Sequence, residues 1–146
     1  MKSKGVIGLV AILTLCLVVG GIFFFNISER PTHKFLLPKG FTGWVEVIYE
    51  QPGYPALKKE NQFIIYEVPS SGKIMTSSKN ITGPMVFNYI EADGKRTDFP
   101  ENAEMIHGLK TSSGGTGNTD GTTEKTPQKL TFFVGTKEKW NNKPTP

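Results

Sequence analysis

The chain has 146 residues, which leaves room for one domain and an accessory segment. Its 17 basic and 13 acidic residues give a net charge of +4, and the only adjacent basic pairs are Lys58-Lys59 and Lys95-Arg96. A nucleic-acid-binding protein would gather such residues on one face, so nucleic acid is not an expected partner. Cys16 is the only cysteine, which excludes disulfides and thiolate metal sites from the rest of the chain.

The first element in the chain is an apolar run from Val6 to Phe25 without a charged residue. As a helix it would be about 30 Å long, the thickness of the hydrocarbon core of a bilayer, so it predicts a membrane-spanning anchor. Lys2 and Lys4 precede it, and cationic residues are retained on the cytoplasmic side. We expect residues 1–5 to form a cytoplasmic tail and the C-terminal domain of this single-pass protein to lie outside the cell membrane.

Two other interpretations of the apolar run remain open. A cleaved signal peptide has a shorter apolar core and small residues at its cleavage site, whereas cleavage after Gly21 would leave Ile22 as a new terminus. A lipoprotein carries its lipid on a cysteine at the end of the apolar core, but further apolar residues follow Cys16. The absence of disulfides in the part outside favours a protein of the bacterial envelope.

The part that follows the anchor predicts a β-rich domain. Residues 26–34 are polar and predict a short tether, and from Phe35 short apolar runs alternate with turn residues. The clearest strand is Val45–Glu50, in which every second residue is apolar or aromatic. Further strands are expected at Gln62–Val68, Lys73–Ser77, Met85–Ile90, Lys95–Phe99, Glu104–Lys110 and Lys129–Val134. Strands of this length without an amphipathic helix predict an all-β antiparallel sandwich over residues 35–140, transthyretin-like or Ig-like.

Glycine-containing segments connect the predicted strands. Gly40 and Gly43 are expected to form the bend that leads into the first long strand, with Trp44 closing the edge of the core. Asp93-Gly94 predicts a hairpin between two strands. Residues 111–127 are rich in Gly, Ser and Thr and predict a flexible loop, and residues 141–146 are expected to form a C-terminal tail.

Residues that carry catalysis or metal binding are sparse. His33 lies in the predicted tether and His107 has only Glu104 nearby, so neither a metal site nor a cofactor is expected. His107 is expected to be partly exposed at a strand end, with lining a small-molecule groove as a second possibility. Tyr54, which follows Pro52-Gly53 in a loop, is the best candidate for an exposed aromatic residue in a binding site.

The order of motifs between Phe35 and Trp140 resembles a known group of proteins. The motifs are LPKGFTGWVEVIYE, PGYPAL, VPSSGKIMTSS, EADGKR, MIHG and FFVGTKEKW. They resemble an uncharacterised family of small bacterial membrane-anchored or lipoprotein β-domains, mostly from Gram-positive spore formers, without an established activity. The resemblance implies no catalytic residues, and this chain departs from the lipoprotein members because Cys16 lacks a proper lipid-attachment context.

Two hypotheses about function follow. The first is a non-enzymatic module, tethered to the membrane, that binds an envelope protein or a cell-wall polymer. The alternative is a small hydrolase outside the cytoplasm with a site near His107, Glu104 and the segment 111–127. The two differ in one observable: an enzyme requires His107 within hydrogen-bond reach of a Ser, Asp or Glu at the base of a cleft.

Overall fold

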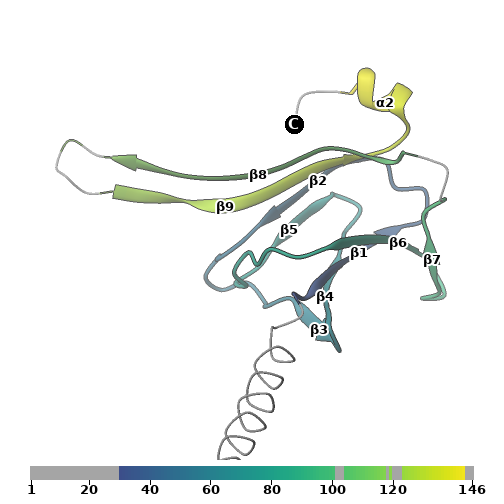
Figure 1. The fold of residues 1–146 in the computed structure, drawn as a ribbon, viewed down its shortest axis with the longest axis horizontal. Coiled ribbons are helices and arrows are strands. Elements are labelled where there is room, and N and C mark those ends of the chain that lie inside the picture. The colour runs from purple at the N-terminus through teal and green to yellow at the C-terminus, as the bar shows by residue number, and fades with distance from the viewer. Residues whose placement is uncertain (1–29, 101–103, 118, 120–122, 144–146) are drawn as a thin grey trace, which may run out of the picture. The chain divides into compact units, whose positions relative to one another are not determined.

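The computed structural model describes residues 30–100, 104–117, 119 and 123–143, and the chain from Pro31 onward forms one compact unit. The predicted span at residues 6–25 lies outside these ranges. Within them, no helix is long and apolar enough to cross a membrane. The described part contains two β-sheets and one short helix (Figure 1). Their elements are β1 (Thr32–Pro38), β2 (Gly43–Ile48), β3 (Lys58–Glu60), β4 (Phe63–Glu67), β5 (Lys73–Met75), β6 (Met85–Ile90), β7 (Arg96–Asp98), β8 (Ile106–Gly117), β9 (Thr123–Val134) and α2 (Lys137–Asn141).

The first sheet has the strand order β3-β4-β1-β6-β7, with β1 at its centre. β1 runs parallel to both neighbours: His33 pairs with Ile64 of β4 and with Met85 of β6. Phe35, Leu36 and Leu37 are all buried, so β1 is apolar on both faces, as is usual for a strand with two parallel neighbours. The prediction of purely antiparallel sheets was therefore wrong.

The second sheet has the order β5-β2-β9-β8 and is also mixed, because β5 runs parallel to β2. β2 contains the alternation seen in the sequence, and the side chains of Val45, Val47 and the following Tyr49 are fully buried. The strand predicted at Val45–Glu50 is confirmed, with bounds shifted by two residues.

The two sheets pack against each other around a shared core. Phe35 of β1 meets Phe132 of β9 edge to face, with 5.1 Å between ring centroids. Phe87 of β6 also contacts Phe132, and Tyr66 stacks on Phe35 at 4.3 Å. The β-rich, two-layer character predicted from the sequence is confirmed, while the transthyretin-like or Ig-like type of sandwich stays a prediction.

The predicted turns are found where glycine permits them. Gly40 and Gly43 have φ angles of 76° and 142°, and β2 begins at Gly43. The Asp93-Gly94 hairpin is present between β6 and β7, where the Glu91 amide donates to the Lys95 carbonyl at 2.9 Å. Trp44 packs edge to face on Phe133, at 5.6 Å between centroids, on the outer face of the second sheet.

Three features of the structure differ from the predictions. The predicted tether includes Thr32, His33 and Lys34, which instead begin β1. Residues 111–127, predicted as a loop, contain the distal parts of β8 and β9, which pair with each other from Ile106 to Gly117. A short helix, α2, was not expected; Thr136 caps it by accepting a hydrogen bond from the Lys139 amide.

The β8–β9 hairpin extends beyond the rest of the second sheet (Figure 1). β2 pairs with β9 only from Lys129 to Val134, so residues 123–128 of β9 have no strand of the sheet beside them except β8. We call this two-stranded extension, residues 113–117 and 123–128, the arm. An isolated pair of strands is marginally stable in water, which makes the arm a surface that would gain from a further strand.

Candidate functional site

The four edges of the two sheets differ in length. The edge strands β3, β5 and β7 have 3 residues each, whereas β8 has 12. Short edge strands offer little backbone for a foreign strand to pair with, and proteins protect longer edges with proline or charge. In the described residues β8 has a partner on one side only, contains no proline and carries Lys110 as its one charged side chain. It is the most accessible edge of the described part of the domain.

The hydrogen bonds of β9 show which amides of β8 face outward. The Tyr49 amide donates to the Gln128 carbonyl, so Gln128 and every second residue after it face β2. Lys129 and Thr131 therefore face β8, where they pair with Ser112 and Lys110. Thr111 lies between Lys110 and Ser112, so its N–H and C=O face away from β9. This backbone position is available to a strand that adds to the sheet.

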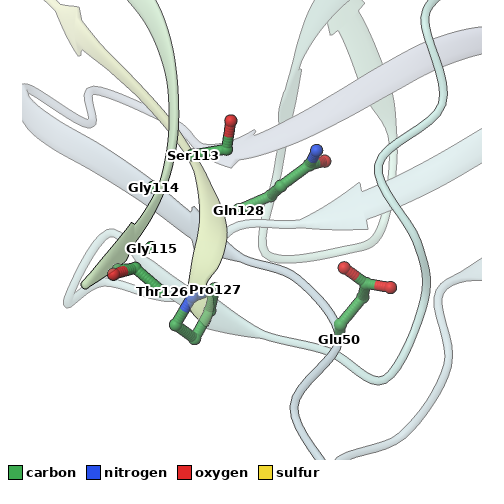
Figure 2. Close-up of a pocket in the computed structure, with 7 residues that line it drawn as sticks. All are labelled: Glu50, Ser113, Gly114, Gly115, Thr126, Pro127 and Gln128. Atoms are coloured by element: carbon green, nitrogen blue, oxygen red, sulfur yellow. The ribbon is translucent and has the colours of Figure 1, made fainter. Parts of the chain in front are cut away.

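A hollow of about 560 Å³ lies between the arm and the turn that follows β2. Its lining residues are Glu50, Ser113, Gly114, Gly115, Thr126, Pro127 and Gln128. Figure 2 shows the side chains of Glu50 and Gln128 extending toward the space between the hairpin and the turn. Glu50 has a φ of 54°, an uncommon conformation for a residue with a side chain, and its amide donates to the Ser78 carbonyl at 3.0 Å. The hollow offers hydrogen-bonding groups and a carboxylate.

The two residues proposed as binding residues from the sequence lie at opposite ends of the second sheet. Tyr54 is 45% exposed in the turn after β2, where its amide donates to the Gln51 carbonyl. His107 pairs with Phe133, next to Trp44 at the start of β2. The fold therefore does not bring Tyr54 and His107 into one site.

His107 is buried, contrary to the expected partial exposure. Its ring stacks on Trp140 of α2 at 5.5 Å, and its Nε2 lies 3.0 Å from the Gly135 carbonyl oxygen. The nearest Glu104 carboxylate oxygen is 3.7 Å from Nδ1, outside hydrogen-bond range. The sequence offered no sign of this burial because Trp140, which covers the ring, lies more than thirty residues away on the unexpected helix.

A buried polar cluster could not be predicted from the sequence, because its members lie far apart in the chain. His33 Nδ1 lies 2.8 Å from the Tyr66 hydroxyl, which in turn lies 3.3 Å from the Tyr49 hydroxyl. All three side chains are at most 1% exposed, and His33 Nε2 has no hydrogen-bond partner among the described residues. Burial lowers the pKa of His33, although the Ile81 backbone opposes the change, and burial raises the pKa of Tyr49 and Tyr66. His33 is therefore neutral at pH 7.

In the described ranges no three His, Cys, Asp or Glu side chains gather in a group that could hold a metal ion. The buried cluster stabilises the core, whereas the open edge of β8 and the neighbouring hollow are accessible. These two features form the candidate site, and both are suited to binding.

Comparison with known proteins gives a family and one solved structure. No curated protein matches the chain. A crystal structure named "Putative Lipoprotein from Bacillus anthracis" matches with a TM-score of 0.56 and 23% sequence identity, over 79% of this chain and 82% of that one. At this identity the likeness concerns the fold. Residues 29–143 match the model of a family of unknown function, so the chain belongs to that family, DUF6843.

Proposed function

We propose that this protein is a non-enzymatic binding module, anchored in a bacterial cell membrane through residues 6–25, whose domain outside the membrane binds an extended segment of an envelope protein. The length and apolarity of the run from Val6 to Phe25 support the anchor. The structural neighbour is named as a lipoprotein, which supports a domain held at the outer face of a membrane. The open edge of β8 is the observation that carries the binding function.

Strand addition is the recognition mode that this edge supports. An extended peptide that pairs with β8 would gain main-chain hydrogen bonds, and alternate side chains would determine specificity. The exposed Leu109 of β8 adds apolar contact area, and the described side chains from Lys110 to Gly115 are all exposed and small or flexible. A partner strand would also convert the two-stranded arm into a three-stranded sheet, which is more stable.

The experiment compares two substitutions at one position. Thr111→Pro removes an N–H that faces away from β9, so it should leave the existing sheet intact while blocking a foreign strand. Thr111→Val keeps the N–H and a β-branched side chain, and serves as the matched control. The full-length chain in detergent is used to capture partners from envelope extracts, and unfolding of both variants is measured.

The expected result is a partner that wild type and Thr111→Val capture and that Thr111→Pro loses without a change in stability. Equal capture by all three proteins would contradict strand addition at β8. Capture that instead depends on the hollow, tested with Glu50→Gln, would favour the other partner class, a wall polymer whose hydroxyl groups bond to the carboxylate.

The anchor has its own test. The intact chain should fractionate with membranes, and protease added outside the cells should remove the domain. A soluble form that begins near Ile22 would contradict the uncleaved anchor, and loss of membrane association on Cys16→Ser would show a lipid anchor in its place.

The alternative function, a hydrolase with a site near His107, finds little support in the described geometry. The His107 side chain is only 5% exposed and lies between Trp140 and the Gly135 carbonyl group. Hydrolysis of ester or glycoside substrates by the wild type, abolished by His107→Gln in a folded protein, would restore this alternative.

A further inference from the structure

The parallel arrangement of β4, β1 and β6 gathers several segments at one end of the first sheet. Thr32 pairs with Phe63, and His33 pairs with Met85, so the three strands start at the same end. The segments that lead into these strands must therefore approach from this end. They are residues 30–31, the turn between β3 and β4, and the connection 79–84.

Large apolar side chains are exposed at this end. Ile81 is 45% exposed in the connection before β6, and Val86 is 37% exposed near the start of β6. Phe63 at the start of β4 is partly exposed, and the Lys34 ammonium group lies 4.0 Å from the centre of its ring. We call this group of residues, completed by the exposed Lys59 and Lys79, the strand-start surface.

The connection that carries Ile81 is fixed to the start of β1. The His33 amide donates to the Pro84 carbonyl at 2.7 Å. Gly83 lies so close to β1 that a Cβ atom there would be 2.1 Å from the Pro31 carbonyl oxygen and 3.1 Å from His33 Nε2. The connection that carries Ile81 is therefore held at a defined position beside β1.

The charges at this end are mostly positive. Lys34, Lys59 and Lys79 are not in the ion pairs found among the described residues, whereas both carboxylate oxygens of Glu60 bond to Arg96, at 2.8 and 3.1 Å. This bonding lowers the pKa of Glu60 and offsets its charge. An apolar surface surrounded by lysines is complementary to anionic lipid head groups and the hydrocarbon beneath them.

The chain itself limits how far this surface can be from a membrane. Phe25, the last residue of the predicted span, is seven residues before Thr32. A fully extended chain of seven residues is at most about 25 Å long. A domain of this size has a diameter of roughly 25–35 Å. The start of β1 is therefore held near the bilayer. The β6–β7 turn lies beside the opposite end of β1, because Pro38 pairs with Ile90.

We propose that the strand-start surface rests on the anionic lipid surface of the membrane that holds the anchor, with Ile81 and Val86 entering the head-group region and the lysines contacting phosphates. This proposal rests on the anchor in the proposed function and is independent of partner binding at β8. It assigns the domain a fixed orientation relative to the bilayer.

The experiment uses the full-length chain with Cys16→Ser, reconstituted in vesicles of phosphatidylethanolamine and phosphatidylglycerol. An environment-sensitive fluorophore is attached to Ile81→Cys or, as the matched control in the β6–β7 turn, to the exposed Ala92→Cys. Emission is measured with and without brominated acyl chains, and flotation of the vesicles reports anchoring. Val86→Cys repeats the measurement at a second position of the surface.

At positions 81 and 86 we expect a blue-shifted emission that brominated lipids quench several-fold more than at position 92. If the protein floats with the vesicles but positions 81 and 92 are quenched equally, the lipid contact is overturned and the anchor is not. A blue shift without quenching would mean that protein covers the surface, and would also overturn it. Failure to float would overturn both the anchor and the surface that depends on it.

Discussion

Replacing Tyr66 with phenylalanine removes one oxygen atom from the centre of the buried cluster. That hydroxyl lies 2.8 Å from His33 Nδ1 and 3.3 Å from the Tyr49 hydroxyl, and His33 Nε2 already lacks a partner among the described residues. The variant leaves His33 Nδ1 and the Tyr49 hydroxyl without the partner that Tyr66 provides. Each buried unsatisfied group costs about 1–3 kcal/mol, so we expect Tyr66→Phe to lose about 2–4 kcal/mol of unfolding free energy.

Tyr49→Phe is the matched control, because it removes the same atom from an equally buried side chain. It breaks only the longer contact and leaves the bond between Tyr66 and His33 intact, so its cost should be about 0.5–1 kcal/mol. Urea unfolding of a fragment that begins at Asn26, monitored by tryptophan fluorescence, measures the unfolding free energy of both variants. In a thermal scan of the same fragment, the melting temperature should fall by roughly 10 °C for Tyr66→Phe and by a few degrees for Tyr49→Phe. Equal losses would refute the central role of the Tyr66 hydroxyl.

Three further predictions concern the same fragment. Because burial lowers the pKa of His33, the stability that depends on its neutral form is present above the unfolded pKa of about 6.5 and is lost as the pH falls toward the folded pKa. His33→Gln should reduce this loss of stability below about pH 6.5, and an unchanged pH profile would contradict the expectation. Gly108→Ala should destabilise the domain by about 1–3 kcal/mol, because the φ angle of Gly108 is 61° and the added Cβ would lie 2.3 Å from Trp140 Cη2. If this clash is the cause, the loss of stability should be smaller when Trp140 is also replaced by alanine. Replacing residues 114–126 with a short turn should leave the melting temperature nearly unchanged, since the residues of this segment whose burial is described, among them Gly114, Gly115 and Thr126, are exposed. A large fall would show that the arm supports the core.

Short-range patterns in the sequence predicted the elements that depend on neighbouring residues. The alternation around Val45 and Val47 identified β2, and Asp93-Gly94 identified the β6–β7 hairpin. Both depend on residues within a few positions of one another. The family resemblance was supported in its coarse form, an uncharacterised family with a lipoprotein-named structural neighbour.

Features that depend on distant residues could not be predicted in this way. The polar start of β1, Thr32 to Lys34, is typical of a tether, and it becomes a strand because β4 and β6 pair with its backbone on both sides. The segment 111–127 lacks apolar residues, and its strands are held by backbone hydrogen bonds, which leave no trace in hydrophobic periodicity. The open edge of β8 was missed for the same reason. The binding roles of Tyr54 and His107 stay predictions.

The central position of β1 has a consequence for the order in which the chain folds. β1 finds its partners only when Phe63–Glu67 and Met85–Ile90 have been synthesised. Gly43, at the start of β2, pairs with Val134 near the other end of the chain. Contacts between such distant segments form slowly, because a long loop must close before they stabilise the structure. A chain of this topology stays unfolded while it is being made, and an unfolded chain is the form that an export channel can thread across a membrane.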